Sequence, residues 1–236
     1  MVIGIDLGTT YSAISILDEQ GNPQIILNKE NEPTTPSVVA IDKDEVFVGK
    51  NAWKKILSIP QKIFRCIKRK MGLRETVYKE GNTEFSPEAV SGFIVRSLLQ
   101  DVLARTTKNV TGIVVTVPTY FSDTKRMSTK HAVEGAVDAL KNGKKEVAER
   151  LETVEFVELI DEPKAAALYY GHCSKRNVGN VLIYDLGGGT FDAALVELKE
   201  GGIRVIAEAE EHEAGGAHFD NKICDYVMDY LKENYQ

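Results

Sequence analysis

The chain has 236 residues, a hydrophobic fraction of 43% and a formal net charge of −6 from 35 acidic and 29 basic residues. This length and apolar content are enough for one large domain or two small ones, each with its own core. An acidic balance without a clustered basic excess predicts neither a nucleic acid nor an anionic membrane as a partner.

The N-terminus argues against secretion. Residues 1–6 contain no basic leader, and an acid comes before any apolar stretch of signal length. No run reaches the ~18 apolar residues of a membrane span. We therefore expect a cytoplasmic protein.

The first third of the chain has the pattern of a β-rich region. Residues 2–7 form an apolar run and residues 12–17 alternate polar with apolar, which predicts a hairpin joined by a glycine turn. Further strands are expected at residues 24–27, 37–41 and 45–48, and a second hairpin at residues 76–85 around Gly81 and Asn82.

The middle of the chain alternates helices with strands. Ser86, Pro87 and Glu88 have the pattern of a helix start, and the amphipathic run continues to residue 104. Ser122 caps a second helical stretch that breaks near residues 142–143 and ends near 152. The remaining elements are strands at residues 110–117 and 154–160 and a helix at residues 163–170.

The last part of the chain is again β-rich. Residues 175–180 are polar and turn-prone, and we place a lobe boundary there. Strands are expected at residues 181–185, 193–198 and 203–210, and a helix at residues 221–231 after the turn Gly215-Gly216.

An internal repeat is the most informative feature. Residues 3–8 read Ile-Gly-Ile-Asp-Leu-Gly, and residues 182–187 read Leu-Ile-Tyr-Asp-Leu-Gly. Each motif precedes threonines and an alternating strand pattern. Two similar strand-turn-strand units therefore begin two lobes.

The turns of this repeat suit a phosphate chain. Backbone amides in a tight glycine turn converge on phosphate oxygens without a side chain in the way. Gly8 and the three glycines at 187–189 fit that geometry, and Thr9, Thr10 and Thr190 add hydroxyl donors. One such turn alone would be read as an ordinary loop, whereas two matching turns favour a binding site.

The repeat also places an acid at the end of each apolar strand. Asp6 and Asp185 have little structural reason to stand there, and facing each other they would repel unless a cation lay between them. The expected cation is Mg²⁺, held mostly through its own waters.

Three further positions stay ambiguous on local sequence alone. Lys68 lies in the run 62–70, whose composition favours a solvated basic helix face. Glu162 precedes Pro163 and is either a helix-capping acid or an acid at the ligand-binding end of a strand. The Gly215-Gly216 turn either approaches a nucleotide or merely packs.

Taken together, these segments resemble the N-terminal ATPase domain of the seventy-kilodalton heat-shock chaperones, whose bacterial members are called DnaK. The resemblance runs over essentially the whole chain. The segments that carry it are residues 4–12, 34–37, 67–72, 116–121, 161–163, 185–192 and 215–216.

The resemblance implies an α/β protein with the actin-like ATPase fold, made of two ribonuclease-H-like lobes. Lobe I would be residues 1–174, with a core subdomain (1–36 and 87–174) and an upper subdomain (37–86). Lobe II would be incomplete, with core residues 175–214 and the beginning of an upper subdomain at 215–236. Because the segments that clasp adenosine would follow Gln236, we expect this chain alone to bind ATP weakly or not at all.

The resemblance also implies the chemistry, which is hydrolysis of ATP to ADP with water as the acceptor. Lys68 would position the water, Glu162 would orient the water and metal shell, and Thr190 would lie beside the γ-phosphate. Asp6 and Asp185 would hold Mg²⁺ through water, Asp185 therefore also serving catalysis, and Asp192 would belong to a site for K⁺. The nucleotide-binding residues would be Gly8, Thr9, Thr10, Tyr11, Gly187, Gly188, Gly189, Thr190, Gly215 and Gly216.

Communication with other domains is implied as well. Pro118 and Arg126 match a proline switch and its arginine, and Tyr120 and Asp123 match neighbours on that path. The implied partners are unfolded client peptides, bound through a C-terminal domain missing here, a J-domain co-chaperone and a nucleotide-exchange factor.

The sequence departs from the family pattern at several places. Glu158 stands where the family usually has an arginine on the face for the interdomain linker and the J-domain. Lys164 replaces a threonine, Ala217 and His218 replace an acidic pair, and the stretch 137–152 is longer than the family connection. This is a divergent member.

Two other functions share these phosphate hairpins. One is an actin-like filament-forming ATPase, and the other is a small-molecule kinase. The Asp-Glu-Pro motif at residues 161–163 favours the chaperone over a filament protein, and the matches at Lys68 and Thr190 favour water over a sugar as the acceptor.

Overall fold

The structure is a computed structural model that describes residues 1–43, 45–174, 179–199, 202–211 and 214–235. The chain divides into two compact units, Met1–Glu162 and Pro163–Gln236. The predicted lobe boundary after residue 174 falls at residues 175–178, which lie outside the described residues. The division into lobes and subdomains therefore stays a prediction.

The first unit is built on a six-stranded sheet with the order β11-β10-β1-β2-β3, in which β4 also pairs with β2. β1 runs antiparallel to β2 and parallel to β10, and β10 runs parallel to β11. Three parallel strands therefore end at one edge of the sheet. The strands are β1 (Val2–Asp6), β2 (Tyr11–Leu17), β3 (Pro23–Ile25), β4 (Thr35–Pro36), β10 (Gly112–Val117) and β11 (Phe156–Asp161).

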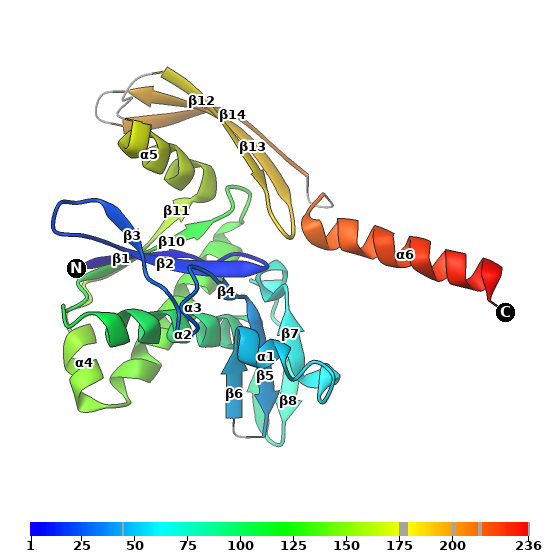
Figure 1. The fold of residues 1–236 in the computed structure, drawn as a ribbon. Coiled ribbons are helices and arrows are strands. Elements are labelled where there is room, and N and C mark those ends of the chain that lie inside the picture. Colours follow the sequence, from blue (N-terminus) through cyan, green and yellow to red (C-terminus); the bar gives the residue numbers. More distant parts are fainter. Residues whose placement is uncertain (44, 175–178, 200–201, 212–213, 236) are drawn as a thin grey trace. The chain divides into compact units, whose positions relative to one another are not determined.

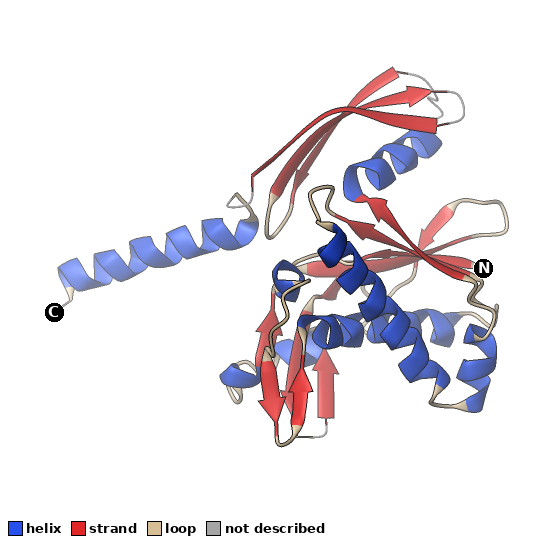
Figure 2. Cartoon of the chain, turned by 180° about the vertical axis from the view of Figure 1, so that it is seen from behind, coloured by secondary structure: helices blue, strands red, loops and turns tan. Residues whose placement is uncertain are grey.

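Two long helices lie on one side of this sheet (Figures 1 and 2), namely α2 (Pro87–Arg105) and α3 (Asp123–Lys141). Their apolar residues share one core with β1 and β10, and Ile3 and Ile5 are almost completely buried in it. Ser86 Oγ accepts a hydrogen bond from Ala89 N at 3.2 Å, as a helix cap should. The helix start predicted at residues 86–88 is confirmed.

The predicted break in the second helical stretch is also confirmed. α3 ends at Lys141, and α4 (Lys145–Leu151) begins after a short turn. Ser122 Oγ accepts from Lys125 N at 3.4 Å and so caps α3.

A smaller sheet with the order β6-β5-β7 belongs to the same unit. The hairpin predicted around Gly81 and Asn82 is present, with Gly81 at a positive φ of 58°. These elements are β5 (Val38–Asp42), β6 (Glu45–Val48), α1 (Lys50–Trp53), the 3₁₀ turn η1 (Pro60–Lys62), β7 (Ile63–Arg65), the 3₁₀ turn η2 (Ile67–Lys70), β8 (Tyr78–Glu80) and β9 (Thr83–Phe85).

The second unit is a three-stranded antiparallel sheet with a helix before it and a helix after it. Ala167 of α5 packs against Ala194 and Val196 of β13. No residue of α6 is buried. The elements are α5 (Glu162–Ser174), β12 (Gly179–Leu186), β13 (Phe191–Lys199), β14 (Gly202–Glu211) and α6 (Gly216–Asn234).

The internal repeat is confirmed in the strand register. Asp6 pairs with Ala13, and Asp185 pairs with Asp192, so each acid faces the residue seven positions later in its own hairpin. β1-β2 and β12-β13 are therefore the same local structure twice.

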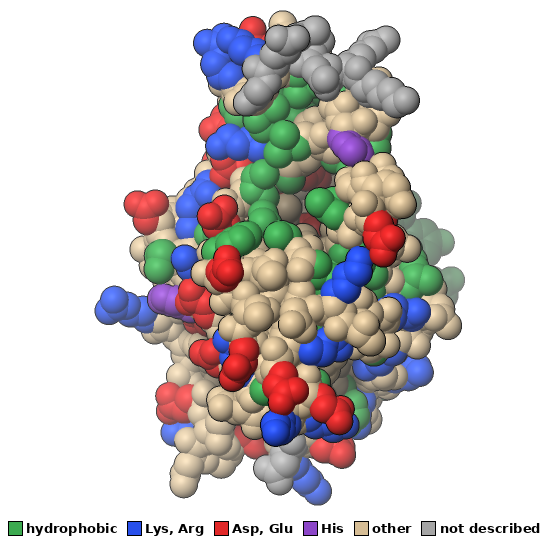
Figure 3. Space-filling view, turned by 90° about the vertical axis from the view of Figure 1, so that its left-hand side faces the viewer, with side chains coloured by type: hydrophobic (Ala, Val, Ile, Leu, Met, Phe, Trp, Pro, Cys, Tyr) green, Lys and Arg blue, Asp and Glu red, His purple; other side chains and the backbone are tan. Residues whose placement is uncertain are grey.

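The described helices include none that is long and apolar enough to cross a membrane. On the face drawn in Figure 3, acidic and basic side chains are interspersed.

Asp101 in α2 yields a prediction about stability and pH. Its side chain is buried, and this burial raises the pKa of Asp101 above its ordinary value of 3.8, with Glu30 adding to the rise and Lys29 and Arg105 opposing it. A carboxyl whose pKa is raised in the folded state binds more protons folded than unfolded, so its contribution to stability falls as pH rises through that range.

We therefore expect Asp101→Asn to be more stable than the wild type at neutral pH, because it removes a buried charge and keeps the shape. The difference between the two urea midpoints should grow as the pH is raised from 3.8 and then level off. A difference independent of pH, or a wild type that is the more stable protein at pH 7, would contradict this account.

Candidate functional site

The first glycine turn is fixed by its own backbone and by a neighbouring segment. A Cβ at Gly8 would lie 2.0 Å from the carbonyl oxygen of Tyr11, so no other residue fits there without moving the turn. Ser37 Oγ donates to Gly8 O and Ser37 N donates to Thr10 O, both at 2.8 Å. The serine after β4 thus holds the turn from outside.

The predicted binding residues of this turn differ in exposure. Thr9 is half-buried, whereas Thr10 and Tyr11 are exposed. Ser12 is buried and shares a 2.8 Å hydrogen bond with Ser37. Thr10 is therefore more open to solvent than Ser12.

Asp6 stands at the end of β1 with an exposed carboxylate. Thr116 Oγ1, on the adjacent parallel strand β10, donates to Asp6 Oδ1 at 3.0 Å. The carboxylate is therefore oriented by its neighbour strand while it remains open to solvent. Sequence reasoning did not identify Thr116, because its partner lies 110 residues away.

Lys68 and Glu162 form an ion pair at the same edge of the sheet. Lys68 Nζ lies 2.6 Å from Glu162 Oε1, and the two side chains are only 8% and 17% exposed. Burial of a lysine side chain is costly without a partner, and the contact with Glu162 offsets that cost. The structure brings these two predicted residues together over 94 positions of sequence.

The composition-based interpretation of Lys68 as part of a solvated helix face is wrong. Residues 62–70 form no continuous helix: they pass through η1, the strand β7 and the 3₁₀ turn η2. Cys66 adopts a left-handed conformation with φ of 54°, which turns the chain so that Ile67 and Lys68 point inward.

A second ion pair lies beside the first. Arg126 Nη2 is 2.5 Å from Oδ1 of Asp161, whose side chain is 9% exposed. The same guanidinium donates at 3.1 Å to the carbonyl oxygens of Thr119 and Phe121, just after Pro118. Arg126 is thus joined to the segment that was predicted to be a switch.

The other two predicted switch residues are placed differently. The Tyr120 ring lies edge-on to Phe121, with centroids 5.6 Å apart. Asp123 is exposed in the first turn of α3. Phe121 and Asp161 were not predicted as site residues, because only tertiary contacts single them out.

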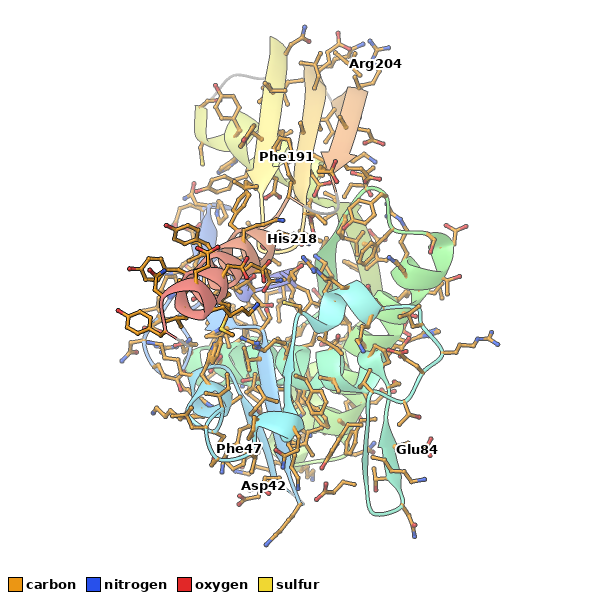
Figure 4. All side chains as sticks on the ribbon, turned by 90° about the vertical axis from the view of Figure 1, so that its right-hand side faces the viewer. Asp42, Phe47, Glu84, Phe191, Arg204 and His218 are labelled. Carbon is orange, nitrogen blue, oxygen red and sulfur yellow. The ribbon has the colours of Figure 1, made fainter. Side chains whose placement is uncertain are left out.

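The second glycine turn connects β12 and β13 and is closed by Gly187 N donating to Thr190 O at 3.0 Å. Thr190 Oγ1 donates to Asp192 Oδ2 at 3.0 Å. Figure 4 shows Phe191, which follows this turn, and His218 in the first turn of α6. The turn therefore carries a hydroxyl and a carboxylate that orient one another.

The Gly215-Gly216 turn packs directly on that glycine turn. Gly216 N and Ala217 N, at the start of α6, donate to the carbonyl oxygens of Gly187 and Gly188 at 3.0 and 2.9 Å. A Cβ on Gly215 would lie 2.4 Å from the carbonyl carbon of Gly189.

These contacts orient the peptide planes of the turn. The C=O and N–H groups of a trans peptide point in opposite directions. Since the carbonyls of Gly187 and Gly188 face α6, the N–H groups of Gly188 and Gly189 point away from it. The two predicted glycine segments are therefore one structure.

His218 caps this junction. Its Nδ1 accepts a hydrogen bond from Gly215 N at 3.2 Å, which satisfies a backbone donor at the start of α6. The residue that departs from the family pattern thus has a local structural role.

The comparisons with known proteins identify the family. The protein family described as Hsp70 protein matches residues 2–236. The chain belongs to the Hsp70 family.

Bacterial relatives of this Hsp70 chain agree. It is 38% identical over 237 aligned positions to proteins named "Chaperone protein DnaK" from Thermotoga petrophila, Thermotoga maritima and Thermotoga neapolitana. The alignment covers 99% of this chain but 37% of each relative's length. The resemblance to the heat-shock chaperones and the actin-like ATPase fold are both confirmed, and they favour the chaperone over the filament and kinase alternatives.

The predicted ligand-site residues of this Hsp70 chain are divided between the two units. Lys68, Glu162, Asp6 and the Gly8 turn belong to the first unit. Asp185, Asp192, Thr190 and the two glycine turns belong to the second. Their roles toward a ligand stay predictions.

Gly8→Ala should destabilise the first unit, because the added Cβ meets backbone rather than a flexible side chain. We expect a loss of about 1–3 kcal/mol in the free energy of unfolding. Gly135→Ala in α3 is the matched control, since its Cβ would meet nothing within 4 Å. Equal urea midpoints for the two variants would contradict the steric argument.

Gly215→Ala should separate the start of α6 from the glycine turn. Hydrogen exchange at the amides of Gly216 and Ala217 should then accelerate, by about tenfold or more if one close backbone contact is lost. Gly202→Ala in the same unit adds a Cβ with no atom within 4 Å and should leave both amides protected. Unchanged exchange in Gly215→Ala would show that the packing is not required.

Proposed function

We propose that this chain is the N-terminal part of the nucleotide-binding domain of an Hsp70 chaperone. In the full-length protein it binds ATP with Mg²⁺ and hydrolyses it to ADP and phosphate. The hydrolysis drives a C-terminal peptide-binding domain that assists protein folding. The buried Lys68–Glu162 ion pair, at the edge where the parallel strands end, carries this proposal beyond family membership.

The ion pair suits activation of a water molecule. In phosphoryl transfer the protein mainly positions groups and stabilises charge. Lys68, held by Glu162 at 2.6 Å, offers a fixed cation for the charge that develops on the γ-phosphate oxygens. Glu162 offers its carboxylate as an acceptor that orients the attacking water. Because the pair is largely desolvated, its effect is stronger than that of exposed groups.

The glycine turns would supply the phosphate contacts. In the first unit, the turn at Gly8 presents Thr9 and Thr10, and Tyr11 follows. In the second unit, the contact with α6 directs the N–H groups of Gly188 and Gly189 away from the helix. Thr190, whose hydroxyl already contacts Asp192, would lie beside the γ-phosphate.

The magnesium ion is assigned on the family resemblance. Among the described residues, no group of three or more histidine, cysteine or acidic side chains is placed so that it could hold a metal ion. Mg²⁺ usually keeps several of its waters and needs one or two carboxylates. The family resemblance assigns that role to Asp6 and Asp185. When bound, the ion would neutralise charge on the phosphates. Asp192 is assigned to a K⁺ site on the family resemblance.

The proposed partners follow from the same membership. Pro118, Tyr120, Asp123 and Arg126 would connect the nucleotide site to the peptide-binding domain. The contacts of Arg126 with the carbonyl oxygens of Thr119 and Phe121 support this assignment. Unfolded peptides, a J-domain co-chaperone and a nucleotide-exchange factor would be the partners, and the cytoplasm the location.

Lys68→Ala in the full-length protein tests the proposal. We expect single-turnover hydrolysis of ATP to fall by about 100-fold or more, because one preorganised cation is lost, while nucleotide affinity stays close to that of the wild type. Lys62→Ala is the matched control, since Lys62 lies in the same basic run and pairs instead with Glu80 at 3.0 Å.

The control should hydrolyse ATP at the wild-type rate. Unchanged turnover in Lys68→Ala would contradict the assignment of Lys68 to the hydrolysis step. A large loss of nucleotide binding would place Lys68 in binding rather than in the chemical step.

A further inference from the structure

Two consecutive acids, the last residue of β11 and the first residue of α5, are each paired with a cation from a different element. Asp161 Oδ1 lies 2.5 Å from Arg126 Nη2 of α3, and Glu162 Oε1 lies 2.6 Å from Lys68 Nζ of η2. Asp161 and Lys68 are both buried. Ion pairs therefore connect the end of β11 and the start of α5 to α3 and to η2.

Arg126 joins Asp161 to a third segment. Its Nη2 also donates to Thr119 O, and its Nε donates to Phe121 O, both at 3.1 Å. The planar guanidinium fixes several acceptors at once in a way that a lysine cannot. A carboxylate that holds this plane thereby fixes the position of the segment between Pro118 and Phe121.

Phe121 connects that segment to Lys68. The ring is 6% exposed and belongs to a small core cluster with Met71, Val117 and Ala132. Met71 follows directly after η2, the turn that carries Lys68. Lys68 Nζ lies 5.9 Å from the Phe121 ring centroid, within the range of a cation–π contact. Movement of Phe121 would therefore change both the packing of η2 and the surroundings of the ammonium.

We propose that Asp161 is a positioning residue for the Lys68–Glu162 ion pair. Its carboxylate holds the Arg126 guanidinium, Arg126 holds the carbonyls of Thr119 and Phe121, and the Phe121 ring holds η2 and Lys68. Asp161 also neighbours Glu162 in sequence, so the same contact fixes the strand end that directs Glu162. The role of the ion pair in hydrolysis rests on the proposed function, whereas the positioning itself does not.

The charge of Asp161 is the decisive property. Hydrogen bonds to charged groups are roughly twice as strong as those between neutral groups. Asparagine at position 161 would keep the shape and one acceptor oxygen, but it would lose the charge. Asp161→Asn therefore tests the ion pair without creating a cavity.

The experiment measures how fast acetic anhydride acetylates each lysine of the folded chain, with quantification by mass spectrometry. Lys68 is protected in the wild type by burial and by Glu162. In Asp161→Asn its acetylation should accelerate by about tenfold, the effect of replacing one charged hydrogen bond by a neutral one. Lys62, which is paired with Glu80 in the same unit, should react at an unchanged rate and so report that the fold is intact.

Two further variants separate positioning from general destabilisation. Asp161→Glu restores the charge and should return Lys68 most of the way to its wild-type rate. Arg126→Lys keeps the positive charge but loses the planar set of donors. It should therefore accelerate the acetylation of Lys68 as Asp161→Asn does. In the double variant Asp161→Asn/Arg126→Lys the two increases in acetylation rate should not add, because both substitutions disrupt the same Asp161–Arg126 ion pair.

Unchanged acetylation of Lys68 in Asp161→Asn would overturn the proposal, and so would fully additive effects in the double variant. If Asp161→Asn fails to fold, Lys62 will also become reactive, and the comparison of Asp161→Glu with Arg126→Lys then decides. Because acetylation involves no nucleotide, this result is independent of whether Lys68→Ala abolishes hydrolysis.

Discussion

In the first unit, the segments that carry the candidate site are held together by ion pairs that compensate buried charge at the end of β11. Lys68 and Asp161 are buried, and each would be expensive to bury without its partner. Their pairs with Glu162 and Arg126 bring together η2, α3 and the segment after β10. η2 lies far in sequence from the other two segments, which follow one another in the chain. The parallel pairing of β10 with β11 makes the arrangement possible, because it places the ends of both strands at one edge.

The internal repeat shows how the same local sequence acquires different surroundings. Both hairpins have the same register, yet Ile3 and Ile5 are 0% and 1% exposed, whereas Leu182 and Tyr184 are 67% exposed. In the first unit, α2 and α3 supply the covering apolar side chains. The register of a hairpin is set locally by its turn, but burial depends on which other elements pack against the sheet.

The two glycine turns are also held by different means. A side chain at Gly8 would collide with the backbone of its own turn, and Ser37 holds that turn through hydrogen bonds. In the second turn a Cβ at Gly187 would find ordinary contact distances, and the close approach occurs instead at Gly215, which touches Gly189. In the first unit the residue between β4 and β5 supports the turn, and in the second the start of α6 does so. Each turn is therefore held in place by hydrogen bonds from a segment outside it.

The sequence by itself determined the local elements and the family. Contacts within a few residues determine the caps at Ser86 and Ser122, the turn at Gly81 and the repeated hairpins. Such local elements can be predicted from the sequence alone. The composition of residues 62–70 predicted a solvated helix face, and this prediction was wrong. A basic run has the same composition whether its lysines are exposed to solvent or buried in ion pairs. Only the tertiary structure decided that Lys68 is buried against Glu162, that Asp161 holds Arg126, and that Gly215 packs on Gly189. These contacts join residues far apart in the chain, and they depend on burial, which strand pairing and helix packing create and which no local pattern specifies.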